Sequence, residues 1–239
     1  MSTRAGGCSR APYDSLNLGD HVGDDPADVR RNREHFAAAL GAQPVFLTQV
    51  HGTRVVWLGA GDVLQQNAGG APAIEADAAC TTEPGIACTV MVADCLPVLF
   101  AAPDGSGVAA AHAGWRGLAA GVLENTVATL CEASGCTPGE LQAWLGACIG
   151  PRQFEVGDEV REAFGGEAVA QRFRATGVAG KWWADLCGLA RDRLQAVGLA
   201  SISGGQWCTV EDRSRFFSFR RDRLTGRMAA AVWIRREGG

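Results

Sequence analysis

The stretch TVMVADCLPVLFAAPDGSGVAAAHAGWRG, residues 89–117, decides the fold. It holds two apolar runs, residues 89–92 and 108–111, and the segment 103–107 between them, PDGSG, is typical of a turn. Short apolar runs that are bounded by turn residues are typical of buried strands. This stretch therefore predicts two buried strands, the first of them over 86–92.

Each predicted strand leads to a reactive side chain. The first leads to Asp94 and Cys95, and the second leads to His112. Neighbouring side chains on a strand point to opposite faces, so Cys95 and His112 can meet only where the strands end or bend. Pro97 and Gly114 supply such breaks. We therefore expect Cys95 and His112 at one common point beside the strand ends.

Apolar periodicity and turn residues predict the elements on either side. Asp25 and Pro26 are typical of a helix start and Gly41 of a helix end, so a helix is expected over 26–40. Further helices are expected over 118–130, 158–164 and 182–197. Further strands are expected over 44–50, 53–58, 76–80, 142–149, 207–209, 216–219 and 228–234, and a polar loop over 59–72. Because helices and strands interleave irregularly, the sequence indicates an α/β (α+β) fold with a mixed sheet.

Composition limits the expected partners and compartment. The 239 residues carry a net charge of −4 at pH 7, so we expect neither nucleic acid nor a membrane surface as a partner. The chain has no apolar run of about eighteen residues, and its N-terminus lacks the apolar core of a signal peptide, which indicates a cytoplasmic protein. The nine cysteines are odd in number and many lie in apolar runs, which favours buried thiols over disulfides.

His51 joins Cys95 and His112 as a candidate, because it follows the predicted strand 44–50 and precedes Gly52. The spacing of the three residues matches no zinc-finger or zinc-ribbon pattern. Three ligands from separate strand ends would leave one metal position for water or substrate, as in catalytic zinc sites. From the residues alone, a metal site stays open beside two alternatives, a Cys95/His112 nucleophile pair and plain packing.

Five segments, spread over nearly the whole chain, resemble one known family. They are TQVHGTRV (48–55), ADCLPVLF (93–100), AAAHAGWRG (109–117), IGPRQFEVG (149–157) and RFFSFRRDRLTGRMAAAVWI (215–234). In this order they are similar to the YfiH/YlmD family, whose members have long been labelled polyphenol oxidases or laccase-domain proteins.

The resemblance implies a fold, a metal and an activity. The fold would be a single domain over 1–239 with a four-layer α/β/β/α arrangement and mixed sheets. The metal would be zinc, held by His51, Cys95 and His112. The activity would be phosphorolysis of a purine nucleoside (adenosine, inosine, guanosine or methylthioadenosine) with phosphate, accompanied by adenosine deamination. The partners would thus be small molecules, and the oligomeric state is left open.

Other residues of these segments are candidates for the chemistry. Asp94 could carry protons during deamination or could merely orient a ligand. Arg116, close to His112 in the sequence, is the nearest cation for holding phosphate, and Arg220 could line an anion pocket. Asn17 and Gln49 could bind the base or the ribose. Phe219 occupies a position where the family commonly has tyrosine, so no role is assigned to Phe219.

Three alternative functions are compatible with the same residues. The first is a copper-dependent polyphenol oxidase of the laccase type, with copper as the cofactor, although four histidines are few for several histidine-rich copper sites. The second is a cysteine hydrolase of peptidoglycan precursors, with Cys95 as nucleophile and His112 as base. The third is a metal-binding module without turnover.

Overall fold

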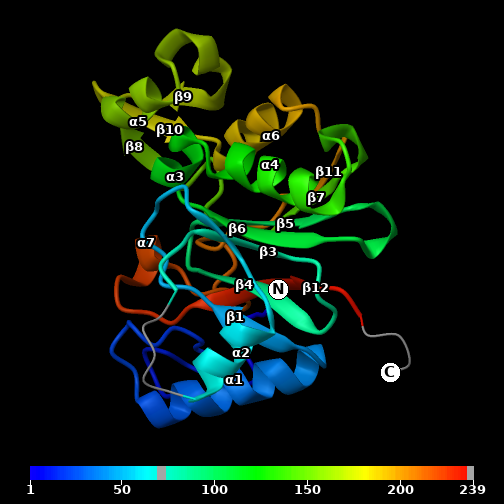
Figure 1. Ribbon diagram of the computed structural model, residues 1–239. Coiled ribbons are helices and arrows are strands. Elements are labelled where there is room, and N and C mark those ends of the chain that lie inside the picture. The colour runs from blue at the N-terminus through cyan, green and yellow to red at the C-terminus, as the bar shows by residue number, and fades with distance from the viewer. Residues whose placement is uncertain (69–73, 236–239) are drawn as a thin grey trace.

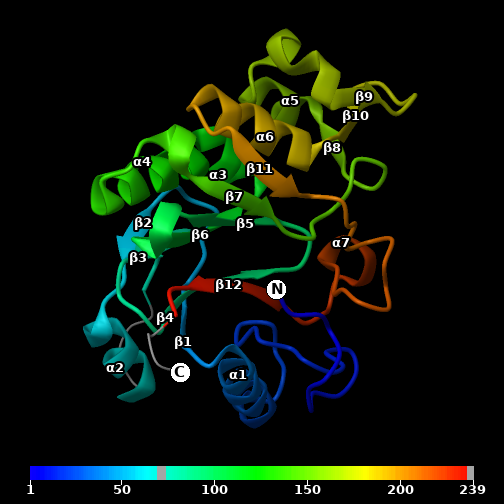
Figure 2. The same ribbon diagram turned by 90° about the vertical axis from the view of Figure 1, so that its right-hand side faces the viewer.

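Four layers make up the computed structural model, which describes residues 1–68 and 74–235 (Figures 1 and 2). Helix α1 (Pro26–Leu40) covers one face of a three-stranded sheet, and a six-stranded sheet lies on its other face. Helices α3 (Trp115–Ala120), α4 (Val122–Ser134) and α6 (Leu186–Ala196) cover the outer face of the six-stranded sheet. The expected α/β/β/α arrangement is confirmed, whereas a single domain over all of 1–239 stays a prediction.

Both large sheets are mixed, as expected. The three-stranded sheet has the order β1-β4-β12, with β1 parallel and β12 antiparallel to β4. The six-stranded sheet has the order β11-β7-β5-β6-β3-β2, with parallel pairs at its two edges and antiparallel pairs between them. In chain order the strands are β1 (Gln43–Phe46), β2 (Val55–Trp57), β3 (Ala78–Thr81), β4 (Ile86–Val92), β5 (Leu96–Ala101), β6 (Val108–Ala113), β7 (Gln142–Leu145), β11 (Ser201–Gly204) and β12 (Met228–Trp233).

A smaller antiparallel sheet and several short helices complete the described residues. The sheet has the order β8-β10-β9, and it lies beside α5 at the end of the molecule farthest from α1 (Figure 1). Its strands and the remaining helices are β8 (Glu155–Gly157), β9 (Phe173–Ala175), β10 (Lys181–Ala184), α2 (Ala60–Ala68), α5 (Asp158–Ala163), α7 (Phe219–Asp222) and the 3₁₀ turns Pro103–Gly105, Pro138–Glu140 and Gly166–Arg172.

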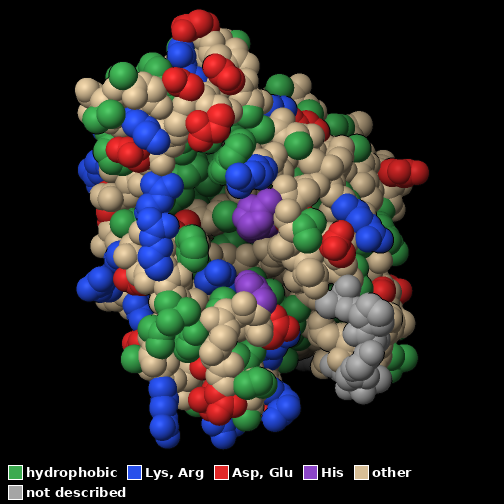
Figure 3. Space-filling view, turned by 90° about the vertical axis from the view of Figure 1, so that its left-hand side faces the viewer, with side chains coloured by type: hydrophobic (Ala, Val, Ile, Leu, Met, Phe, Trp, Pro, Cys, Tyr) green, Lys and Arg blue, Asp and Glu red, His purple; other side chains and the backbone are tan. Residues whose placement is uncertain are grey.

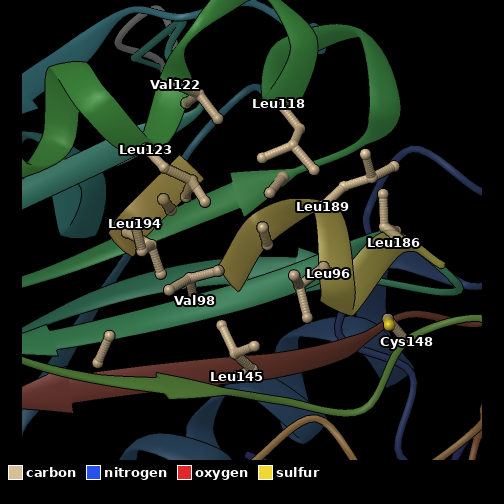
Figure 4. Close-up of a cluster of buried hydrophobic side chains, with 14 of the residues drawn as sticks. Leu96, Val98, Leu118, Val122, Leu123, Leu145, Cys148, Leu186, Leu189 and Leu194 are labelled. Atoms are coloured by element: carbon tan, nitrogen blue, oxygen red, sulfur yellow. The ribbon is translucent and has the colours of Figure 1, made fainter. Parts of the chain in front are cut away.

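Each boundary between layers is packed with apolar side chains, which explains the continuous apolar runs of the sequence. Every residue of β4 is buried, because α1 covers one face of its sheet and the six-stranded sheet covers the other. Above the six-stranded sheet, Leu96 and Val98 of β5 meet Leu123 of α4 and Leu189 of α6 (Figure 4). Burial of these side chains is the main term that stabilises the stack.

The chain crosses between the two large sheets at the position of the candidate cysteine. It leaves the three-stranded sheet after Val92 and enters the six-stranded sheet at Leu96, so Cys95 lies in the three-residue crossover. Strands β5 and β6 form a hairpin in which Leu96 pairs with Ala113 and Pro97 with His112. Cys95 and His112 therefore meet at the open end of this hairpin.

The sequence missed strand β5, because Pro97 reads as a break. In the structure Pro97 is the second residue of β5, and the ladder between β5 and β7 begins one residue later, at Val98. The missing N–H of the proline therefore interrupts no hydrogen bond to β7.

The start and end of α1 follow the sequence signals. The Asp25 carboxylate accepts a hydrogen bond from the N–H of Ala27 at 2.8 Å, Pro26 is the first helical residue, and Gly41 ends the helix with φ 64°. These are the signals from which the helix over 26–40 was expected.

Three other helix and loop predictions are wrong. Gly121, with φ 102°, divides the helix expected over 118–130 into α3 and α4. The segment 182–197 also divides, because the Asp185 carboxylate caps α6 after the strand β10. The expected loop over 59–72 contains helix α2, and its residues 69–72 lie outside the described part of the chain.

The expected strands of the C-terminal region are also partly wrong. Strand β12 confirms the expectation over 228–234. Cys208 makes only an isolated bridge with Cys148, and Ser218 caps the short helix α7 instead of lying in a strand. The buried rings of Phe216 and Phe217 thus anchor an irregular segment rather than a sheet.

Candidate active site

His51, Cys95 and His112 lie together in the structure. Their ligand atoms are all within 4.8 Å of one another, and the Cys95 Sγ is 3.6 Å from the His51 Nε2. The two imidazole rings meet edge to face with centroids 4.8 Å apart. The three side chains come from a loop, a crossover and strand β6, as convergence at the end of the β5–β6 hairpin requires.

Asp77 holds His112 in place. The His112 Nδ1 is 2.8 Å from the Asp77 Oδ1, and the His112 backbone N–H donates to the Asp77 carbonyl at 2.7 Å. With Nδ1 engaged, the imidazole presents Nε2 as its ligand atom. Sequence reasoning missed Asp77, although a carboxylate within the apolar run Ala76–Cys80 was a usable signal, because a buried charge needs a partner.

The same carboxylate also organises the backbone around His51. Asp77 accepts hydrogen bonds from the N–H groups of Val50, His51 and Gly52 at 3.2, 2.9 and 2.6 Å. His51 has φ 61°, a left-handed conformation that costs a residue with a side chain roughly 1–2 kcal/mol. Three hydrogen bonds to one buried carboxylate offset that cost, so Asp77 positions both histidines.

Two glycines let α3 approach the site. A Cβ atom at Gly114 would lie 2.5 Å from the His51 Cδ2 and 3.2 Å from the Cys95 Sγ. A Cβ atom at Gly117 would lie 2.6 Å from the Gly52 carbonyl oxygen. Only residues without a side chain leave His51 and Cys95 the space they occupy.

The charges of Cys95, His112 and Asp77 support one another. Burial alone would raise the pKa of the Cys95 thiol, but the charge of His112 and hydrogen bonds from both histidines outweigh it and lower this pKa to about 6. Burial alone would lower the pKa of His112, but Cys95 and Asp77 raise it to about 9. Burial opposes ionisation of Asp77 as well, yet hydrogen bonds from His112 and backbone N–H groups lower its pKa. The thiolate, which is the form that binds metal, is thus favoured.

The donor set fits a divalent transition metal. Zinc bonds of ordinary length in a tetrahedral arrangement place a thiolate sulfur about 3.6 Å from an imidazole nitrogen. The observed separation between Cys95 and His51 is 3.6 Å. Among the described residues, these three make up the one group of His, Cys, Asp or Glu side chains with three ligand atoms this close together. Three protein ligands leave a fourth position open, as in catalytic sites.

A cavity of about 720 Å³ opens onto the three ligands. Figure 3 shows the face on which histidine side chains border a hollow, with Lys or Arg side chains around it. The polar side chains of its wall include Asp20, His21, Arg33, Gln49, Asp62, Gln65, Gln66 and Arg227. Its apolar side chains include Val45, Phe46, Leu47, Ile74, Met91 and Phe219. A cavity that combines apolar walls with polar groups beside a reactive cluster is typical of a small-molecule site.

The sequence model of one family, described as multi-copper polyphenol oxidoreductase laccase, matches residues 1–235. YlmD from Geobacillus stearothermophilus, whose crystal structure is known, is 33% identical with a TM-score of 0.89, over 98% of this chain and 90% of that one. The chain belongs to the YfiH/YlmD family.

Two bacterial relatives carry a functional name. The protein named purine nucleoside phosphorylase YfiH of Escherichia coli K12 is 50% identical, over 98% of this chain and 92% of that protein. A protein of Pseudomonas aeruginosa, also named a purine nucleoside phosphorylase, is 49% identical with the same coverage. In this family member, no helix within the described residues has the length and apolar character needed to cross a bilayer.

Gln49 and Asn17, the two residues expected to bind base or ribose, are engaged with the protein itself. Gln49 lines the cavity, but its amide N–H donates to the Met91 carbonyl at 2.8 Å and its Oε1 accepts from the Met91 N–H at 2.7 Å. Asn17 is fully buried, and its amide bonds to Gly19, Asp24 and the N–H of Arg227. Gln49 therefore forms part of the cavity wall, whereas Asn17 lies outside the lining residues.

Asp94 adjoins Cys95 in the crossover, where φ is 99°, and its carboxylate faces the C-terminal segment. Its two oxygens accept from the Thr209 Oγ1 and the Arg220 N–H, both at 2.6 Å. The Arg220 guanidinium points elsewhere, donating to the carbonyls of Gln153 and Glu155. Asp94 therefore ties the start of α7 to the crossover that carries Cys95.

Arg116 follows the site along the chain, but its side chain is exposed and lies over the Trp115 ring, with 4.4 Å from Cζ to the ring centroid. The arginines that line the cavity are Arg33 and Arg227, neither of which sequence reasoning selected. Arg33 packs on the Phe46 ring and pairs with Asp20 at 3.2 Å.

We expect Cys95 of this YfiH/YlmD family member to react with iodoacetamide only after the metal is removed. In chelator-treated protein its pKa of about 6, against an ordinary 9.0, keeps the reactive thiolate at pH 7, and the rate falls as the pH drops below about 6. Peptide mass spectrometry across pH 5–8 measures the labelling, with Cys95→Ser as the control. Equal labelling with and without metal would contradict ligation by Cys95.

Proposed function

We propose that this chain is a metal-dependent purine nucleoside phosphorylase, which transfers the ribosyl group of a purine nucleoside to inorganic phosphate. The observation that carries the proposal is a cavity of about 720 Å³ onto which the His51, Cys95 and His112 ligand atoms open. This volume lies within the range of about 300–1,000 Å³ that is typical of small-molecule sites. Two relatives that are 49% and 50% identical over 98% of the chain are named purine nucleoside phosphorylases, which supports the assignment.

We propose zinc as the metal, and adenosine, inosine, guanosine or methylthioadenosine as substrates, with adenosine deamination as a second activity. When bound, zinc would supply Lewis acidity and lower the pKa of a bound water. Two imidazoles and one thiolate with an open position suit it. The copper oxidase alternative needs several histidine-rich copper sites. The described residues hold a single cluster of potential metal ligands, which contains two histidines and one cysteine.

In phosphorolysis the bond between the ribose C1′ and the purine nitrogen breaks, and a bond from C1′ to a phosphate oxygen forms. The purine leaves with the bonding electrons and is protonated, and positive charge develops on the ribose. Apolar side chains such as Val45, Leu47 and Ile74 line the cavity and help to keep water from this charge. The partly exposed ring of Phe219, over which the guanidinium of Arg227 lies with 5.9 Å from Cζ to the centroid, adds apolar surface at the cavity wall.

Asp94 takes a positioning role in this proposal. Its carboxylate accepts the N–H of Arg220, the second residue of α7, and α7 begins with Phe219. Proton transfer by Asp94 during deamination would require that its carboxylate exchange these hydrogen bonds for contacts to substrate. Positioning needs no such exchange.

The test combines metal analysis with chromatography of nucleosides. Purified protein is incubated with adenosine or inosine, with and without phosphate, beside the variant His112→Ala. We expect about one zinc per chain, release of free base only with phosphate, and loss of both metal and activity in the variant. Stoichiometric copper with phenol turnover, or intact nucleosides under all conditions, would overturn the proposal.

A further inference from the structure

Arg227 is held so that its side chain reaches into the cavity. Its backbone N–H donates to the Asn17 Oδ1 at 2.9 Å. Its aliphatic stem lies against Gly19, where a Cβ atom would be 2.7 Å from the Arg227 Cγ. The fully buried amide of Asn17 and the bare backbone of Gly19 therefore fix the direction of this side chain before any ligand arrives.

The guanidinium of Arg227 is only partly satisfied by protein. Its Nη1 donates to the carbonyls of Thr225 and Gly226 at 3.0 and 3.2 Å. Within residues 1–68 and 74–235, its Nε and Nη2 have no hydrogen-bond acceptor, and no carboxylate forms an ion pair with it. Burial lowers the pKa of Arg227, against smaller opposing effects of Cys95 and Asp94, so the charge is carried at a desolvation cost. An anion that accepted hydrogen bonds from the remaining donors would offset this desolvation cost.

Three other arginines are less suited to a free anion. Arg33 shares the cavity, but its charge is paired with Asp20 and its Nε donates to the Leu18 carbonyl at 2.9 Å. The guanidinium of Arg220 donates to two backbone carbonyls. Arg116 lies over the Trp115 ring and does not line the cavity. Arg227 also faces an aromatic ring, with 5.9 Å from its Cζ to the Phe219 centroid, but unlike Arg116 it lines the same cavity as the metal ligands and retains donors.

We propose that Arg227 binds the inorganic phosphate co-substrate through Nε and Nη2. This inference rests on the proposed phosphorolysis, to which it assigns the phosphate subsite. The Nε and Nη2 donors lie on one edge of a planar guanidinium, and two parallel hydrogen bonds from that edge match two phosphate oxygens. Phosphate would then lie between Arg227 and the metal ligands, with a third oxygen left to form the bond to C1′.

The test compares Arg227→Gln and Arg227→Lys with the control Arg174→Gln. Arg174 is an exposed arginine on β9, outside the cavity, so its replacement removes the same charge without touching the site. The measurements are the KM for phosphate, the KM for nucleoside, and calorimetric binding of sodium phosphate to the metal-loaded and the chelator-treated protein.

We expect Arg227→Gln to raise the phosphate KM and Kd about tenfold or more while the nucleoside KM stays within about twofold. Arg227→Lys, which keeps the charge but loses the planar edge, should be intermediate, and Arg174→Gln should match the wild type. The lysine variant also serves if the glutamine variant does not fold. Unchanged phosphate constants in both Arg227 variants, or no phosphate binding by the wild type, would overturn the inference.

The calorimetric measurement separates this inference from the proposed function. If the wild type binds phosphate through Arg227 but releases no base from any nucleoside, the subsite stands and the phosphorylase assignment fails. If base is released and the Arg227 variants keep the wild-type phosphate constants, the assignment stands and the subsite fails.

Discussion

Replacing Asp77 with asparagine is expected to lower the affinity for metal about 10- to 100-fold and to reduce phosphorolysis accordingly. The amide keeps the shape of the carboxylate but loses its charge. It also brings N–H groups toward the N–H donors of Val50, His51 and Gly52, which the carboxylate now satisfies. Because an amide has a single acceptor oxygen, either the Nδ1–H of His112 or the N–H groups of Val50 and Gly52 face the amide N–H2 instead of an acceptor, so one of the two histidines is less well fixed as a ligand.

Competition with a chromogenic chelator measures the metal affinity of Asp77→Asn, and thermal unfolding measures its stability. The matched control is Asp104→Asn, because Asp104 lies in an exposed turn with φ 60°, a conformation that asparagine tolerates well. The control should bind metal like the wild type. If Asp77→Asn also binds metal like the wild type, then Asp77 is not the group that positions both histidines.

Replacing Gly114 with alanine is expected to abolish stoichiometric metal binding and to reduce activity about 100-fold or more, although only one methyl group is added. The backbone conformation, φ −68° and ψ 157°, suits alanine, so no strain arises there. The new Cβ would lie 2.5 Å from the His51 Cδ2, which is inside van der Waals contact. The imidazole must move, and a displaced ligand no longer completes the set with Cys95 and His112.

Metal content per chain and phosphate-dependent base release are the two measurements for Gly114→Ala. Gly61→Ala is the control, because a Cβ atom at Gly61 in α2 would meet nothing within 4 Å. Wild-type metal content in Gly114→Ala would show that His51 can retreat without leaving the site, and the steric argument would then be wrong.

Much of the fold was predictable where local signals are strong. Asp25, Pro26 and Gly41 gave the bounds of α1, and the all-apolar run of β4 gave a buried strand. The break at Gly121 was harder to predict, because the apolar spacing of 118–130 continues across it while the backbone turns. Periodicity reports which side chains are buried, but not whether the axis bends.

The three ligands could be selected from the sequence, whereas the residues that support them could not. His51, Cys95 and His112 are reactive types beside apolar runs, which is a local property. The position of Asp77 beside both histidines depends on the pairing of β3 with β6, which no local pattern specifies. Arg116 was chosen because it is close to His112 in the sequence, and Arg220 because a strand was expected over 216–219. The path of residues 216–228 is instead largely irregular and places Arg227, not Arg220, at the cavity.

The crossover between the two large sheets has a consequence for folding. The three ligands, His51, Cys95 and His112, come from segments far apart in the chain. They converge only once the β5–β6 hairpin, strand β3 with the preceding Asp77, and the crossover are assembled. An unfolded chain offers no such cluster, so a metal bound here stabilises the native state by mass action. Separation of the sheets would release the ion in the same event, and the rate of metal loss to a strong chelator would report how often the stack opens.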